Sequence, residues 1–238
     1  MKKKTIFNIF ANSALFLALI AISLVSFMPA KSVGNVQTTS ARILALYEGN
    51  RNSNKVSLMI NVYWGTEYVQ PMLNVLKQKG VTTTFFVGGS WAAENEELLK
   101  KIQAYGHEIA NHGYNHRDHD KLSLDANISE ISACHAIVKS ALGQEMNLFA
   151  PPSGAYSDAT ISAATSLGYK TIMWTRDTID WRDHNTNLIV SRATNGAKGG
   201  DLVLMHPTAN TLEALPQIID ILQQKGLSVD TVSNVLKP

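Results

Sequence analysis

Two histidines four residues apart, His112 and His116 in the segment HGYNH, are candidates for metal chemistry. One turn of helix brings imidazoles at this spacing together, and imidazole nitrogens are common zinc ligands. Zinc normally takes three or four protein ligands, so the pair alone leaves a second interpretation open, two loop histidines without a metal. Asp118, His119 and Asp120 follow closely, and we expect them to form a solvated loop.

A further histidine, His206, ends the apolar run in VLMHPT and is a candidate proton donor. Imidazole titrates near neutral pH, which suits a group that delivers a proton during a reaction. Asp177 or Asp180 in the segment DTIDW could orient the ring, because a carboxylate fixes the tautomer of an imidazole. The alternative is a buried histidine that bonds to a backbone carbonyl. For His107 and His184 the sequence indicates no partner.

The elements that must position these residues alternate between strand and helix about seven times, which predicts an α/β fold with a parallel sheet, open or closed into a barrel. Val56–Val62 is a short apolar run with β-branched residues, and Glu67–Lys79 has apolar residues at helical spacing before Gly80. The candidate residues follow predicted strands, and the carboxyl ends of parallel strands carry the functional site in such folds. The other expected strands are 82–87, 107–111, 147–150, 169–174 and 202–205, and the other expected helices are 94–105, 124–142, 157–167, 188–194 and 212–225.

The helix expected at 124–142 carries two residues for which packing is the better explanation. His135 lies on the apolar stripe of this helix, so we expect a structural histidine in the core. Cys134 is the only cysteine of the chain, which excludes an intrachain disulfide and a cysteine-based zinc site. We expect Cys134 to be an inert packing residue.

The N-terminal segment has the pattern of an export signal. Lys2, Lys3 and Lys4 precede an uncharged, largely apolar stretch at 6–28. The stretch is also long enough to span a bilayer, so a cleaved signal and a retained membrane anchor both stay open. Either one places the domain outside the cytoplasm, because the lysines stay inside. The sequence thus divides into a signal or anchor at 1–31, a tether and leading segment at 32–54, and a single domain at 55–238.

The composition excludes two broad classes of protein. Hydrophobic residues make up 45% of the 238 residues, which is the proportion of a globular protein and excludes global disorder. The formal net charge is +2, and three lysines lie within the first four residues, so the domain itself is close to neutral. This balance provides no broad basic face, and we expect no nucleic-acid partner.

Several segments, taken in order, resemble the polysaccharide deacetylase family, the NodB homology domain of carbohydrate esterase family 4. They are VSLMINV with VTTTFFVGG, then GHEIANHGYNH, FAPPSGAYS, TIMWTRDTIDW and GDLVLMHPT. The segments NVYWGTEY and LMHPT are most similar to a sporulation-associated subgroup from Gram-positive bacteria. The resemblance covers roughly residues 55–238 and implies a distorted (β/α) barrel of about seven parallel strands.

The resemblance also implies a metal-dependent mechanism. In the family, one aspartate and two histidines hold a divalent metal, a second aspartate is the base, and a histidine protonates the departing amine. His112 and His116 match the two metal histidines. His206 matches the acid, and Asp177 matches the carboxylate that tunes it. The implied metal is zinc.

This chain departs from the family pattern at three positions. The paired aspartates that end the first strand are replaced by Asn61 and Val62, and the arginine that tunes the base is replaced by Ala150. An asparagine cannot accept a proton as a base, and a valine cannot bind a metal. Base and arginine form one electrostatic unit, because an arginine without its carboxylate would be a buried charge without a partner. Their joint absence indicates the loss of one function.

Taken together, these observations predict an exported protein of the deacetylase fold that faces cell-wall glycan. Trp181 and Leu204 match the family's apolar wall around the acetyl methyl group. The implied partner is peptidoglycan or another polymer of N-acetylglucosamine, with a membrane contact if the N-terminal segment is uncleaved. We expect weak or absent deacetylase activity and doubtful metal binding, and the alternative is an active metal-dependent N-deacetylase.

Overall fold

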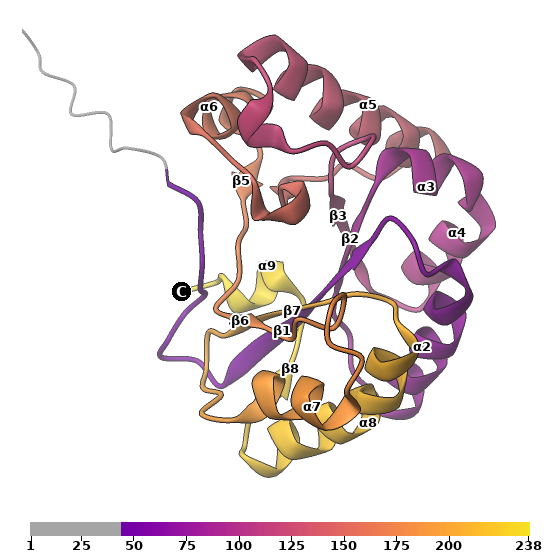
Figure 1. The fold of residues 1–238 in the computed structure, drawn as a ribbon, viewed down its shortest axis with the longest axis vertical. Coiled ribbons are helices and arrows are strands. Elements are labelled where there is room, and N and C mark those ends of the chain that lie inside the picture. Colours follow the sequence, from indigo (N-terminus) through magenta and orange to yellow (C-terminus); the bar gives the residue numbers. More distant parts are fainter. Residues whose placement is uncertain (1–43) are drawn as a thin grey trace, which may run out of the picture. The chain divides into compact units, whose positions relative to one another are not determined.

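The computed structural model describes residues 44–238, which build a curled parallel sheet surrounded by helices (Figure 1). The strands follow the order β5-β4-β3-β2-β1-β7-β6, and every pairing along this path is parallel. No pairing between described strands joins β5 to β6, so the barrel is open there. The predicted distorted barrel of seven parallel strands is confirmed. The strands are β1 (Lys55–Val62), β2 (Thr84–Val87), β3 (Glu108–Asn111), β4 (Leu148–Phe149), β5 (Lys170–Thr171), β6 (Arg176–Asp177), β7 (Leu202–Met205) and β8 (Ser228–Val229), of which β8 pairs with the start of β1.

The longer helices lie on the outer side of the curl, as Figure 1 shows. Helix α5 has the predicted bounds, because Ser123 caps its first turn and Gly143, with a φ of 65°, ends it in the left-handed conformation that glycine adopts without strain. The helices are α2 (Thr66–Gln78), α3 (Gly89–Glu94), α4 (Glu96–Ala104), α5 (Leu124–Leu142), α6 (Asp158–Ser166), α7 (Thr186–Thr194), α8 (Ala209–Gln224) and α9 (Val232–Val235), with short 3₁₀ turns at His119–Lys121 and Pro152–Gly154.

Side chains alternate across the sheet and fill two separate apolar clusters. Along β1, Leu58 and Ile60 face the outer helices, whereas Met59 faces the interior of the curl. Helix α9 closes the inner cluster through Val232 and Val235, which are fully buried there. The interior is therefore packed with side chains over most of its length.

Two predicted elements differ from the structure. The helix expected at 94–105 is α4, and a short helix that was not predicted, α3, precedes it; Asn95 separates the two with φ −126° and ψ 39°. The strand expected at 169–174 is only β5, and the chain then forms β6, a short strand that the sequence pattern did not indicate. A two-residue strand such as β6 is defined by its pairing with β7 and leaves no periodicity in the sequence.

The folded domain begins earlier than the predicted residue 55. The amide of Leu46 donates to the carbonyl of Thr171 at 2.8 Å, and its carbonyl accepts from the amide of Met173 at 2.8 Å. Leu46 therefore forms a parallel bridge with Ile172 at the β5 edge of the sheet, and the amides of Gly49 and Asn50 donate to Gly200 and Val235. The signal or anchor expected at 1–31, and the tether as far as residue 43, lie outside the described residues. In the described part of the chain, no helix has the length and apolar character that crossing a membrane requires.

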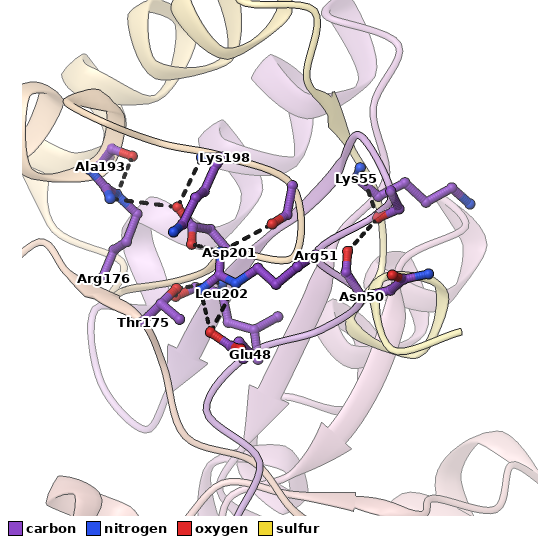
Figure 2. A network of polar contacts seen from close by, with 12 residues as sticks. Glu48, Asn50, Arg51, Lys55, Thr175, Arg176, Ala193, Lys198, Asp201 and Leu202 are labelled. Atoms are coloured by element: carbon purple, nitrogen blue, oxygen red, sulfur yellow. Dashed lines mark hydrogen bonds and ion pairs between the residues drawn. The ribbon is translucent and has the colours of Figure 1, made fainter. Parts of the chain in front are cut away.

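A network of charged side chains fixes this leading segment to the sheet (Figure 2). Arg51 lies between Glu48 and Asp201, and its Nη1 bonds to Oδ1 of Asp201 at 2.5 Å. Asp201 is almost fully buried and also accepts from the amide of Lys198 at 3.1 Å and from Arg176 at 3.5 Å. The carboxylate of Asp201 thus joins the leading segment to the chain that enters β7.

Cys134 and His135 are adjacent on α5 but have different surroundings. Cys134 is buried, and burial raises the pKa of its thiol to about 12, so inert packing is the correct description. The prediction of an apolar environment for His135 is wrong. Its ring is only half-buried, with Nδ1 bonded to the hydroxyl of Tyr169 and Nε2 to Glu145 at 2.7 Å. The histidine is structural through polar contacts that the helical stripe did not indicate.

We expect Asp201→Asn to lower the free energy of unfolding by about 2–4 kcal/mol, because it removes the charge that two arginines share in a largely buried network. The side chain of Arg51 is 29% exposed, and solvent screening places the effect at the lower end of that range. Urea unfolding of the full-length chain measures the effect. Glu48→Gln is the matched control and should change the midpoint far less, because Glu48 is exposed. Equal shifts in the two variants would contradict the assigned role of Asp201.

We expect His135→Leu to fold and to keep any glycan binding, with a loss of stability of about 1 kcal/mol for the hydrogen bonds removed. The hydroxyl of Tyr169 keeps a second partner, the side-chain amide of Asn111 at 3.3 Å, which limits the cost. Thermal unfolding and binding to a chitin oligomer test both parts. A folded variant without glycan binding would show that His135 acts on the site.

Candidate functional site

A cleft of about 470 Å³ lies at the carboxyl ends of the central strands. It brings together most of the residues that the sequence indicated from distant segments. The predicted site residues that line it are Asn61, His112, His116, Asp177, Trp181, Leu204 and His206. Trp64, Ser153, Gly154 and Trp174 also line it, and sequence reasoning missed them. Trp64 follows β1 at the same edge of the sheet as Asn61, and that position was the one available signal.

The two histidines meet through a loop and not through a helical turn. His112 follows β3, and the loop then uses positive φ at Gly113 and at His116, 72° and 53° respectively. The ring centroids are 5.2 Å apart at an interplanar angle of 70°. The two histidines are close together as predicted, but a loop brings them together and not the predicted turn of helix.

The protonation of the pair follows from its surroundings. Nδ1 of His112 donates to the carbonyl of Ala150 at 2.7 Å, since a carbonyl can only accept, so Nε2 is the unprotonated nitrogen. Burial, and then the neighbouring His116, hold the pKa of His112 well below its usual range. Burial also lowers the pKa of His116. Both rings are therefore neutral at neutral pH.

The residues present do not fit a three-ligand metal site. Within residues 44–238, no group of three or more His, Cys, Asp or Glu side chains is arranged to hold a metal ion. Val62, the position of the third ligand in the family pattern, is fully buried in the outer apolar cluster. The ring of Tyr63 stacks on His116 with centroids 4.8 Å apart. Two neutral imidazoles are fewer ligands than zinc normally takes in proteins.

His206, the predicted proton donor, is bonded to a buried carboxylate, which is Asp180 and not the Asp177 that the resemblance indicated. Nδ1 of His206 bonds to Oδ1 of Asp180 at 2.8 Å, and the backbone amide of His206 donates to Oδ2 at 2.6 Å. Thr211 donates its hydroxyl to the same oxygen at 2.6 Å, and Asp180 is fully buried. Asp177, which the resemblance had indicated, instead accepts from the amide of Ile179 at 2.8 Å and lines the cleft. The carboxylate that orients the ring of His206 is therefore Asp180.

A strained turn explains this exchange of roles. Ile179 has a φ of 54°, which is unfavourable for a β-branched residue. In this turn the carboxylate of Asp177 accepts a hydrogen bond from the backbone amide of Ile179, and the carboxylate of Asp180 reaches Nδ1 of His206. Sequence spacing does not show such a turn.

The base half of the site lacks charge altogether. Asn61 is 4% exposed, and its Oδ1 finds no donor among the described protein atoms. Ala150 is fully buried in the inner cluster together with Met59, on the same side of the sheet as Asn61. A methyl group stands where an arginine would donate to this position. The geometry provides a proton-donor pair and an apolar wall, without a base or a complete metal site.

The fold is an open, distorted α/β barrel with a cleft at the carboxyl ends of its strands, and comparison with known proteins gives the family. The family model of polysaccharide deacetylases matches residues 48–172. The chain is 32% identical over 176 residues to a peptidoglycan-N-acetylglucosamine deacetylase of Bacillus cereus, which covers 71% of this chain and 82% of that protein. The chain belongs to the polysaccharide deacetylase family.

Two further relatives resemble the chain more closely in sequence. It is 37% identical over 191 residues to the Bacillus subtilis protein YlxY, which covers 80% of this chain but only 60% of YlxY. A solved structure, a carbohydrate esterase family 4 pseudoenzyme from Bacillus anthracis, superposes with a TM-score of 0.80 at 36% identity, covering 82% of this chain and 69% of that one. A mutant of that pseudoenzyme with restored enzymatic activity is also solved.

We expect zinc binding well below that of a three-ligand site, because His112 and His116 provide two ligands and Val62 cannot provide the third. Dialysis of zinc-loaded, full-length protein against metal-free buffer should leave far less than one zinc per chain by elemental analysis. His112→Ala should remove the residual binding, and His135→Leu, which lies outside the cleft, should leave it unchanged. Stoichiometric zinc that survives dialysis on three protein ligands would overturn this account.

Proposed function

We propose that this chain is an exported member of the polysaccharide deacetylase family that binds N-acetylated cell-wall glycan with weak or no deacetylase activity. One observation carries the proposal. The cleft keeps the hydrogen-bonded pair of His206 and Asp180 and the apolar side chains of Trp181 and Leu204, whereas the family's base position holds Asn61. The B. cereus relative acts on peptidoglycan N-acetylglucosamine by its name, which supports the choice of glycan.

The missing groups account for low activity in free-energy terms. A positioned general base contributes about 10²–10⁴ in rate, and an amide at Asn61 cannot supply it. A bound metal polarises the carbonyl and activates the attacking water, and it stabilises the transition state by several kcal/mol. With Val62 in the outer cluster, both contributions are weakened together. The B. anthracis pseudoenzyme supports this reading as a structural relative.

Location outside the cytoplasm rests on the N-terminal sequence. Three lysines followed by an apolar stretch suit either a cleaved signal or a membrane anchor. Peptidoglycan lies outside the cytoplasmic membrane, so a relative that deacetylates it supports the same location. A sporulation-associated role, indicated by the segments NVYWGTEY and LMHPT, belongs to the same proposal.

A second candidate function is an active, metal-dependent N-deacetylase. The observation that favours it is the intact pair of His206 and Asp180, which an enzyme of this family needs to protonate its leaving amine. Acetate release by the unmodified protein decides between the two. Efficient release would establish the enzyme and reject the proposed degenerate site.

We expect the combined change Asn61→Asp, Val62→Asp and Ala150→Arg to create measurable acetate release from a chitin oligomer or a peptidoglycan fragment. Asn61→Asp supplies the base, and Ala150→Arg pairs with it. Val62→Asp restores the third ligand of the family pattern, which requires the end of β1 to turn this side chain from the outer cluster toward the two histidines. Adding His206→Ala to the triple variant should remove most of this activity, because the departing amine loses its proton donor.

Each single change should do little for activity, because residues that act as a unit are non-additive. Val62→Asp alone should also destabilise the domain, since it places a carboxylate in an apolar cluster. Zinc should raise the unfolding temperature of the triple variant but not of the parent. A folded, zinc-loaded triple variant without acetate release would contradict the view that only the base half is missing.

A further inference from the structure

The loop that follows β1 covers two of the cleft's histidines with aromatic rings. Tyr63 stacks on His116, as described above, and Trp64 stacks on His206. The indole of Trp64 and the imidazole of His206 are nearly parallel, with an interplanar angle of 9° and centroids 5.7 Å apart. One face of Trp64 therefore rests on the histidine that the family uses as its acid.

The stack is held rigidly from both sides. Gly65 has a φ of 71°, and a Cβ there would lie 2.0 Å from the carbonyl oxygen of Pro207, so only glycine lets the loop approach so closely. The next residue, Thr66, accepts a hydrogen bond from the indole nitrogen of Trp91 at 2.9 Å. His206 itself is fixed by the Asp180 carboxylate. Trp64 is thus preorganised and is not a loosely attached surface side chain.

Trp64 remains partly exposed where it lines the cleft. Trp64 is 42% exposed, and Trp181, which lines the same cleft, is 52% exposed. Large apolar side chains exposed beside a concave site mark a ligand-binding groove. Trp174 adds a third indole to the lining, and the volume of about 470 Å³ lies within the range of small-ligand sites.

The charge of the cleft narrows the ligand class. The described residues that line it include no lysine or arginine, and the one carboxylate among them is Asp177. An anionic ligand would meet no cation there. A neutral sugar suits the site better, because a pyranose ring has an apolar C–H face for stacking and polar groups at its edge. The side chains of Asn61 and Asp177 offer hydrogen-bonding partners to those groups.

We propose that Trp64 is a stacking platform for the pyranose ring of an N-acetylglucosamine residue, and that this contact holds the glycan without a metal ion. The inference rests on the proposed function, namely that the cleft binds cell-wall glycan. It adds which residue makes the main contact and which sugar unit is bound. Trp64 touches neither an attacking water nor a leaving group in this role. It determines binding and specificity.

The test is calorimetric titration of the full-length chain with tetra-N-acetylchitotetraose, with either EDTA or zinc in the buffer. We expect binding of similar strength in both buffers. Trp64→Ala should weaken binding about tenfold or more, as the loss of a central aromatic contact does. Trp64→Phe keeps a ring and should restore most of the affinity. Trp64→Leu keeps apolar bulk without an aromatic face and should not.

The matched control is Tyr105→Ala, which removes a half-buried aromatic ring at the end of α4, outside the cleft, and should leave the affinity unchanged. If Trp64→Ala fails to fold, the comparison of Trp64→Leu with Trp64→Phe still decides. Equal binding by the parent and by Trp64→Leu overturns the role of Trp64, and binding lost in EDTA overturns the claim that the contact holds glycan without a metal ion; in both cases glycan binding itself stands. Acetate release is followed in the same samples, so efficient release, or no binding by the parent, is recognised separately as failure of the proposed function.

Discussion

The buried carboxylate of Asp180 is the interaction on which the rest of the site depends. A fully buried charge is costly unless donors surround it, and this one accepts from the ring of His206, the backbone amide of His206 and the hydroxyl of Thr211. These bonds join the β6–α7 region to β7 and α8. They also fix the plane of the imidazole, and that plane supports the indole of Trp64. One satisfied charge therefore positions both His206 and the exposed ring of Trp64.

At Asn61 and Ala150, the cost of a buried charge is avoided by having no charge at all. A carboxylate at position 61 would be buried and would need a cation, and a cation at position 150 would need that carboxylate. The chain avoids both requirements with an amide and a methyl group. Val62 completes the change, because an apolar side chain is stable in the outer cluster where a carboxylate is not. The three substitutions are thus mutually consistent, and a change at position 61 or 150 alone would leave a buried charge without its partner.

The sequence predicts those features that depend on periodicity and on strand order. The bounds of α5 and β7 are correct, because a long apolar stripe with a cap and a four-residue apolar run are local signals. The position of His206 at the edge of the sheet follows from β7 in the same way. The choice of Asp180 over Asp177 was not predictable, because it depends on the positive φ of Ile179. Spacing alone also could not show that a loop brings His112 and His116 together. Trp64 was missed because its function lies in a contact with His206, which is distant in the sequence.

The intact acid pair has an explanation that does not require catalysis. In an enzyme, Asp180 keeps His206 ready to protonate a leaving amine. In the proposed glycan-binding protein no such step is needed, yet the pair still determines where the indole of Trp64 lies. Removing Asp180 would free the imidazole to rotate and would take away the surface on which Trp64 stacks. A protein that binds glycan through Trp64 therefore needs the Asp180–His206 pair as much as an enzyme does. The presence of this pair is consequently no measure of activity, whereas Asn61 and Val62 bear on activity directly.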